Sequence, residues 1–161
     1  MIPSDHFVRF YNEVFKFLDE KGELDEYFAR IAKNQEFFCL QQFKTGGLQG
    51  VYDYYLKIRH EENCEMDIIF EDGELIMKMT RCPSLSKAID NDAGVCSKYC
   101  QHCLGWTQRI YDLAGLYQIF DLGDWDDPTC CEWIFDDLSK AQARFEEIAE
   151  TVPAERLYKN F

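Results

Sequence analysis

The sequence predicts a single α+β domain. Three observations support this class: apolar residues recur at helical spacing near the N-terminus, alternate with polar residues in the middle, and return to helical spacing before the C-terminus. The chain has 161 residues, of which 47% are hydrophobic, which suits one core better than two. We therefore expect one domain over residues 1–161, with N-terminal helices, an antiparallel β meander, a Cys-rich helix, further strands and a C-terminal helix.

Helical periodicity dominates the first part of the chain. The predicted helices cover residues 7–18, 24–31 and 37–43. Ser4 is placed to cap the first helix and Gly22 to end it. The pair Gly46-Gly47 is expected to break the third.

A period of two residues then predicts strands. The alternating segments are residues 52–58, 64–70 and 75–81. Asp72-Gly73 suits a hairpin turn, because glycine tolerates the positive φ that such a turn needs. The interpretation is a three-stranded antiparallel meander that ends at Cys82-Pro83, where proline removes a ladder donor.

The second half of the chain mixes both periods. In chain order we expect a short helix at 84–89, a polar break at 90–92, a longer helix at 95–116, and strands at 117–122 and 130–135. The two strands are separated by an acidic turn at 123–128. Ser139-x-x-Gln142 resembles a capping box that opens a last helix.

Charge and composition exclude several classes of partner. The formal net charge of -13 repels phosphate backbones and anionic lipid headgroups, so neither nucleic acid nor a membrane is an expected partner. Asp5, Arg9 and Glu13 interrupt any apolar leader, and no stretch approaches the ~20 apolar residues of a membrane span. We therefore expect a cytoplasmic protein; its oligomeric state is not predicted.

The eight cysteines fall into two groups. In a reducing compartment, cysteines are thiols, metal ligands or catalytic groups before they are disulfides. Cys39 and Cys64 stand alone among apolar residues and are expected in the core. The other six lie between Cys82 and Cys131, where that density predicts a chemical site.

The spacing of these six thiols favours a zinc site. Cys96, Cys100 and Cys103 are four and three residues apart and would share one face of a helix. Cys82 at the end of one strand and Cys131 at the start of another can converge on that face. Tetrahedral zinc needs four nitrogen or sulfur ligands, and the predicted set is Cys82, Cys100, Cys103 and Cys131.

Cys131 is preferred to Cys130 by strand alternation. Cys131, Trp133 and Phe135 share one strand face, and the aromatic side chains predict that this face is the inner one. Cys130 would then point outward. His102 lies two residues from Cys100, which turns it away from the thiol face of a regular helix.

An iron–sulfur cluster is a lower-ranked alternative to zinc. Cys96-x3-Cys100-x2-Cys103 matches the cluster-binding pattern of radical S-adenosylmethionine enzymes, but those enzymes use a large partial barrel, and only 58 residues follow Cys103. An ordinary cluster with Cys82 as a fourth ligand uses the same thiolates.

Nucleophilic catalysis needs a cysteine beside a base or an electropositive group. Cys82 with His102 is the pair that we predict for that role.

Short motifs between residues 75 and 135 resemble one enzyme family. LIMKMTRCPSLSKAI, YCQHC and CCEWIF follow one another in an order that resembles the L-2-amino-thiazoline-4-carboxylic acid hydrolase family. The late Cys-x-aromatic strand is also similar to vinyl-reductase-type small-molecule-binding domains. The resemblance implies hydrolytic opening of a small ring containing sulfur and nitrogen and bearing a carboxylate, with functional weight on Cys82, Cys100, Cys103 and Cys131.

This chain departs from the family by its Cys130-Cys131 doublet, by Cys96 and by a short acidic connection before the final strand. A bound carboxylate would need a counter-charge from Arg81, Lys98 or Arg109.

Three functional hypotheses follow. The first is a zinc protein that resembles these hydrolases, in which three thiolates plus water would permit hydrolysis with His102 as acid or base. The second is a metal-free cysteine hydrolase that uses Cys82. The third is a non-catalytic sensor or small-molecule-binding module in which the cysteines hold a structural metal. All three imply a small-molecule ligand or substrate.

Overall fold

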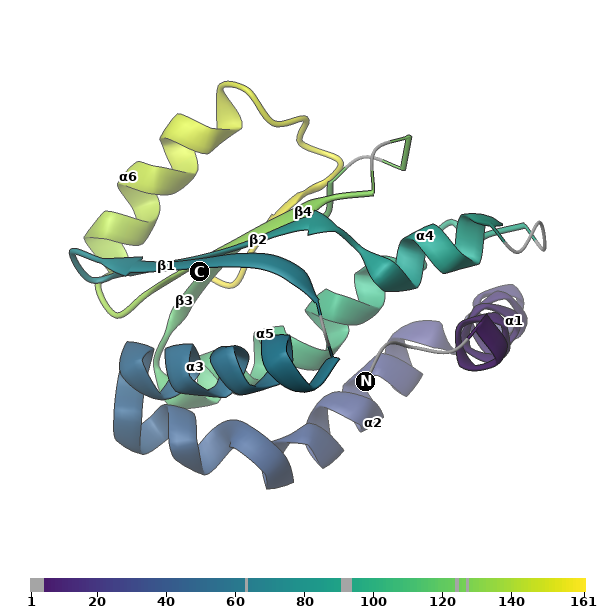
Figure 1. Cartoon of the computed structure of the whole chain (residues 1–161), viewed down its shortest axis with the longest axis horizontal. Helices are drawn as coiled ribbons and strands as arrows, with labels where there is room; N and C mark the ends of the chain where they lie inside the picture. The colour runs from purple at the N-terminus through teal and green to yellow at the C-terminus, as the bar shows by residue number, and fades with distance from the viewer. Residues whose placement is uncertain (1–4, 63, 91–93, 124, 127) are drawn as a thin grey trace.

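The computed structural model describes residues 5–62, 64–90, 94–123, 125–126 and 128–161, and it confirms the α+β class (Figure 1). The helical elements are α1 (Asp5–Lys21), α2 (Leu24–Gln35), the π-helical turn η1 (Glu36–Leu40), α3 (Gln41–Glu62), α4 (Pro83–Asp90), α5 (Gln101–Ala114) and α6 (Leu138–Ala149). The strands are β1 (Glu65–Glu71), β2 (Glu74–Arg81), β3 (Tyr117–Asp121), β4 (Cys130–Phe135) and β5 (Leu157–Lys159).

One antiparallel sheet organises the chain. Its strand order is β1-β2-β4-β3-β5, so the β1–β2 hairpin pairs with the later strands through β2 and β4. Helix α6 covers one face of the sheet, whereas α3 and α5 cover the other, with α2 beyond them (Figure 1). Both faces of β4 are therefore covered by helices.

Three of the four apolar clusters formed by the described residues fill the layers around the sheet. The largest lies between the sheet and the helices α3 and α5, where Val51, Leu75 and Ile134 are fully buried. A second joins α1, α2 and α4 around Phe15. The third lies between α6 and the sheet around Ile119.

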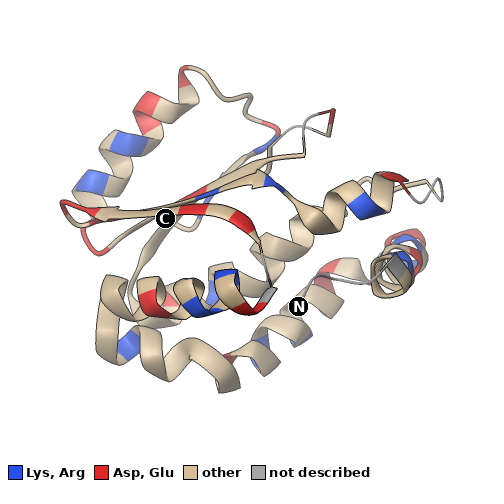
Figure 2. Ribbon diagram, viewed as in Figure 1, with Lys and Arg blue, Asp and Glu red and all other residues tan. Residues whose placement is uncertain are grey.

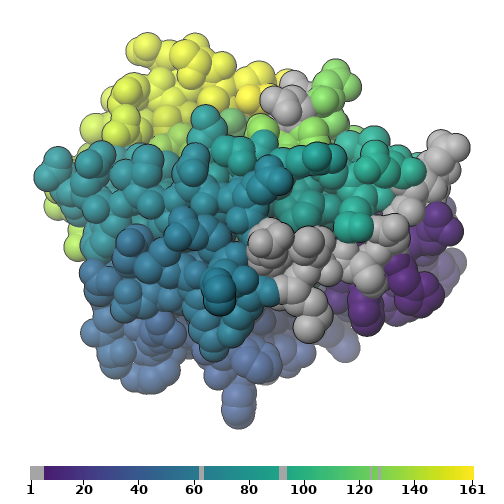
Figure 3. Space-filling model, in the orientation of Figure 1, coloured from purple at the N-terminus to yellow at the C-terminus, as the bar shows by residue number. Residues whose placement is uncertain are grey.

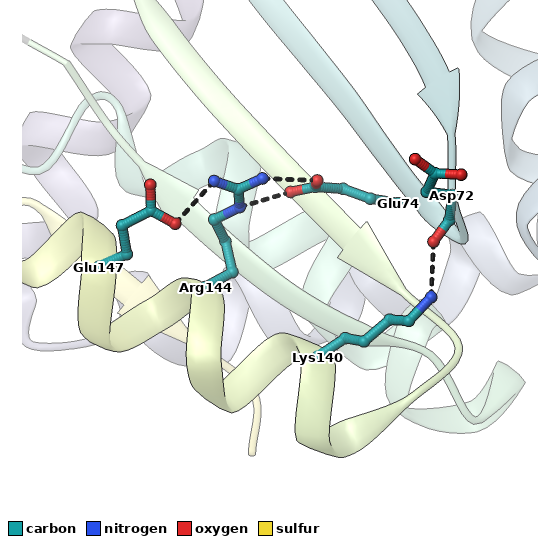
Figure 4. A network of polar contacts seen from close by, with 5 residues as sticks. All are labelled: Asp72, Glu74, Lys140, Arg144 and Glu147. Atoms are coloured by element: carbon teal, nitrogen blue, oxygen red, sulfur yellow. Dashed lines mark hydrogen bonds and ion pairs between the residues drawn. The ribbon is translucent and has the colours of Figure 1, made fainter.

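Polar contacts hold the β1–β2 hairpin against α6 (Figure 4). The guanidinium of Arg144 donates to both carboxylate oxygens of Glu74, each at 2.8 Å, and also to Glu147 at 2.8 Å. The ammonium of Lys140 donates to the carbonyl of Asp72 at 2.6 Å. The predicted Asp72-Gly73 turn is confirmed, with positive φ at both residues.

The prediction of a strand at residues 52–58 was wrong, because this segment belongs to α3. The meander therefore has two strands instead of three. Leu48, Val51 and Tyr55 also recur at helical spacing, and the first two are buried in the main core. The Gln49 amide donates to Asp53 at 2.8 Å, a contact between residues one helical turn apart.

The Cys-rich helix begins six residues later than predicted. Residues ahead of α5 are held in a non-helical path by the buried Asn12 of α1, whose amide donates to Gly94 O at 2.7 Å. The Asn12 Oδ1 atom accepts from the backbone N–H of Cys96 at 2.8 Å. Cys96 consequently packs against α1 and α4 instead of sharing a helix face with Cys100 and Cys103.

The ends of two further elements differ from the prediction. Helix α6 is capped by Asp137, whose side chain accepts from Lys140 N at 2.9 Å, so Ser139 lies within the helix and opens no capping box. Strand β5 was not predicted; it has three residues and pairs only with β3. The predicted Ser4 cap and most of the break at 90–92 lie outside the described residues.

The surface mixes both signs of charge. Figure 2 shows both positively and negatively charged residues on α3 and on α6. In the face shown in Figure 3, the N-terminal helix and α6 lie at opposite corners of the molecule. Within the described ranges, no helix combines the length and the apolar character that crossing a membrane requires.

Candidate functional site

Four thiols line one small cavity at the junction of β2, α5 and β4. They belong to Cys82, Cys100, Cys103 and Cys130, and His102 lines the same cavity. The cavity volume is about 20 Å³, and a single water needs about 10–15 Å³. The space therefore suits one ion or one water and is too small for an organic substrate.

Cys82 is fixed where β2 ends and α4 begins. Its backbone N–H donates to the carbonyl of Pro128 at 2.6 Å, which ties it to the loop before β4. Its carbonyl accepts from Ser86 N at 3.0 Å, and its sulfur accepts from Leu85 N at 3.4 Å. Cys82 thus serves as the N-cap of α4, and Pro83 occupies the first helical position, where its missing N–H costs nothing.

The next two thiols lie at the N-terminus of α5. Cys100 is the residue that precedes the helix, and Cys103 lies in the first turn, with its N–H donating to Cys100 O at 3.3 Å. Both side chains pack beside Leu104 and Phe120, together with Cys130 at the start of β4. Four thiols from three segments of the chain therefore line one cavity.

The structure corrects the choice between the two cysteines of β4. Cys130 and Glu132 face α5, whereas Cys131 and Trp133 face the opposite side of the sheet, toward α6. Cys131 lies across from Lys78 on β2 and does not line the cavity. The aromatic residues did mark an inner face, but helices cover both faces of β4.

His102 contacts Cys103, and it lines the same cavity as Cys82. Its Nδ1 contacts the carbonyl of Tyr99 at 2.5 Å, and because a carbonyl only accepts, Nδ1 must carry the proton. Its Nε2 is then the acceptor that faces the Cys103 sulfur at 3.6 Å. Burial lowers the pKa of His102. His102 is therefore a neutral imidazole that accepts from a thiol.

Burial keeps the cavity thiols protonated at neutral pH. It raises the pKa of Cys100 to about 12 and also raises those of Cys103 and Cys130, with smaller contributions from the neighbouring thiols. Burial also raises the pKa of Cys82, while backbone hydrogen bonds from Leu85 and Ser84 lower it. A free thiolate nucleophile is unfavourable here.

All eight cysteines are free of disulfide bonds in the structure. Within the part of the chain that the structure describes, no three His, Cys, Asp or Glu side chains are grouped tightly enough to hold a metal ion as they stand. Cys39 is buried in the main core and Cys64 packs at its edge, as expected.

The three predicted counter-charges lie elsewhere. Lys98 pairs with Asp19 at 2.6 Å and Arg109 pairs with Glu36 at 2.6 Å, and neither lines the thiol cavity. Arg81 is exposed at the end of β2 and does not line it either.

A buried polar network beside the thiols was not predicted. Glu132 is 4% exposed and Gln118 is fully buried. The Gln118 amide donates to Glu132 and, at 2.8 Å, to Thr107. Burial raises the pKa of Glu132 to about 7, although hydrogen bonds from Gln118 and Tyr111 lower it. The available signal was the alternation Cys130-x-Glu132-x-Ile134, which places a carboxylate in the middle of a core-facing row.

Comparisons with known proteins add no relative. No protein-family model, curated protein or solved structure matches this chain. The resemblance to the thiazoline carboxylic acid hydrolases stays a prediction that rests on short motifs.

Proposed function

We propose that this chain is a small zinc-binding protein in which Cys82, Cys100, Cys103 and Cys130 hold the ion. The observation that carries this proposal is the convergence of four thiols on a cavity of about 20 Å³. Zinc–sulfur bonds are about 2.3 Å long, so tetrahedral geometry requires sulfur atoms about 3.8 Å apart. Binding would draw the four side chains inward from their present positions.

Burial raises the pKa of Cys82, and backbone hydrogen bonds from Leu85 and Ser84 offset part of that rise. The N–H of Leu85 donates to the Cys82 sulfur at 3.4 Å, and the N-terminus of α4 would help to stabilise a zinc-bound thiolate there. Because burial raises the pKa values of these thiols, zinc must displace protons, and binding weakens as pH falls.

We further propose that the zinc site is structural and that the protein is a non-catalytic binding module. Four thiolates close the coordination shell, whereas hydrolysis needs an open position for water. The cavity has no room for a ring substrate, and His102 faces Cys103. Ring hydrolysis and a Cys82 nucleophile are therefore less well supported than a structural metal.

The adjacent cysteines of β4 supply a matched test. Zinc content is measured by elemental analysis after loading under reducing conditions and removal of free zinc, for wild type, Cys130→Ser and Cys131→Ser. We expect one zinc per chain in wild type and in Cys131→Ser, and a loss of most of the bound zinc in Cys130→Ser. No stoichiometric zinc in wild type, or equal loss in both variants, would contradict the proposal.

A cobalt titration covers the case in which Cys130→Ser does not fold. Cobalt(II) replaces zinc and reports thiolate ligation by visible and near-ultraviolet absorption. Wild type should show four-thiolate absorption with release of protons to the buffer. Cobalt absorption without thiolate bands would refute the ligand set.

A further inference from the structure

Helix α1, at one edge of the molecule (Figure 1), carries a second apolar row besides the one that packs into the core. Val8 and Phe15 are buried with residues of α2 and α4. Phe7, Phe10 and Phe17, in contrast, are 59%, 60% and 58% exposed. Soluble monomers rarely expose large contiguous apolar patches, and a helix that is apolar on two sides is expected to be covered on both. The body of the protein covers one side, so the other side suits a partner.

The spacing of the exposed row is that of a coiled-coil seam. The row, which we call the α1 seam, consists of Phe7, Phe10, Val14 and Phe17. Their intervals of three, four and three residues place them at successive a and d positions of a heptad repeat. Lys21 takes the next a position, and its ammonium lies 5.6 Å from the centre of the Phe17 ring. A second helix with the same spacing would complete this seam.

The area of the seam is sufficient for a specific dimer. An aromatic side chain presents about 200 Å², so the three exposed phenylalanines and the flanking Tyr11, which is 36% exposed, offer about 400 Å² per chain. Two chains would together bury about 800 Å² of apolar surface. Because homodimer interfaces are about 65% apolar, the whole contact would reach about 1,200 Å², above the roughly 1,000 Å² that a specific interface needs.

Charge favours an antiparallel pairing of two α1 helices. In a parallel pair identical positions meet, so Lys21 would stand against Lys21 of the second copy. An antiparallel pair separates these two ammonium groups to opposite ends of the seam. Glu13, beside the middle of the seam, would then face its own counterpart, but its carboxylate is paired with Lys16 at 2.7 Å. The antiparallel pair therefore meets less repulsion.

We propose that the chain forms a homodimer about a twofold axis through an antiparallel pair of α1 helices. Phe7 of one copy packs against Phe17 of the second copy, and Phe10 packs against Val14, so that a positions meet d positions. None of these four side chains lines the thiol cavity. The dimer contact is therefore a surface distinct from the proposed zinc site.

Sedimentation velocity of the full chain over a series of protein concentrations tests the dimer. Wild type should pass from monomer to dimer as the concentration rises. Phe10→Ala/Phe17→Ala removes two rings of the seam and should weaken dimerisation at least tenfold, because the contact loses apolar area. Phe37→Ala/Phe38→Ala is the matched control: it removes two rings of η1 that are 96% and 74% exposed, and it should change dimerisation less than twofold.

Paired charges test the direction of the two helices. Phe7→Lys and Phe17→Glu should each weaken dimerisation, because each places a lone charge in an apolar contact. The double variant Phe7→Lys/Phe17→Glu should dimerise at least threefold more tightly than either single variant, since residue 7 faces residue 17 of the second copy. In a parallel pair, like charges would meet at both positions and the double variant would dimerise most weakly.

Three results would overturn the proposal: a wild type that stays monomeric throughout, equal losses in the two alanine variants, or a Phe7→Lys/Phe17→Glu variant weaker than both single variants. A monomeric wild type that co-sediments with phosphatidylcholine vesicles, with binding lost in Phe10→Ala/Phe17→Ala, would assign the seam to a lipid surface instead. Circular dichroism should show unchanged helix content in every variant, because the substituted side chains are exposed in the monomer.

Discussion

We expect the buried Glu132 to lower the stability of the folded chain at neutral pH. In the folded chain its pKa is about 7, against an ordinary value of 4.5. The unfolded chain therefore loses this proton near pH 4.5, while the folded chain holds it up to about pH 7. Between these values the unfolded state binds fewer protons, so stability falls as pH rises.

The expected loss of folding free energy follows from the difference between these two pKa values. At pH 5 the cost is about 1 kcal/mol, and above pH 7 it levels off at about 3 kcal/mol. Glu132→Gln cannot ionise and should be more stable than wild type, with the difference growing by about 2 kcal/mol from pH 5 to pH 8. A flip of the Gln118 amide would offer its Oε1 atom, which lacks a partner among the described residues, to the new amide.

Urea unfolding at several pH values measures this difference, with identical metal content in all samples. Subtracting one variant from the other cancels every other titrating group. The exposed Glu146→Gln, which removes the same charge from α6, is measured alongside as a control for the loss of one carboxylate. A change of less than about 0.5 kcal/mol between pH 5 and pH 8 for Glu132→Gln would refute the reasoning.

Three further substitutions probe the packing and the caps. Gly105→Ala should destabilise by about 1–3 kcal/mol, because its Cβ would meet Phe28 at 2.6 Å; Phe28→Leu should recover part of this loss in urea unfolding. Arg144→Ala removes the paired contacts to Glu74 and should cost about 1 kcal/mol, less at high salt, as a double-mutant cycle with Glu74→Gln would measure. Asp137→Ala should lower stability by about 1 kcal/mol through loss of the α6 cap, whereas Asp137→Asn should lose little.

The sequence predicts those parts of the fold that depend on the conformational preferences of a few neighbouring residues. The Asp72-Gly73 turn follows from backbone preferences of two residues, and Gly22 ends α1 with the positive φ that glycine favours. The start of α5 could not be predicted in this way. It depends on Asn12, 84 residues before Cys96, whose side chain replaces the helical hydrogen bonds of that segment.

The misassigned strand in α3 shows a different limit. Its tyrosines satisfy a period of two and a period of 3.6 together, so the short segment carries both patterns. The helical pattern becomes clear only when Leu48 and Val51 are included, because these residues extend the apolar row backward by one turn and pack in the main core.

The thiol cluster combines both kinds of information. We predicted from the ends of the strands and helices that Cys82, Cys100 and Cys103 would lie close together, and all three line one cavity.

Strand alternation also predicted that Cys130 and Cys131 face opposite sides of the sheet, as adjacent residues of a strand must, and they do. Alternation could not predict which side of the sheet holds the other thiols. Aromatic residues identify a buried face, and both faces of β4 are buried. The choice depends on α6, which covers the Cys131 side and leaves the Cys130 side to α5. For a central strand between two helical layers, the position of the flanking helices therefore decides which of two neighbouring residues joins a site, and the Cys130→Ser and Cys131→Ser pair tests that decision directly.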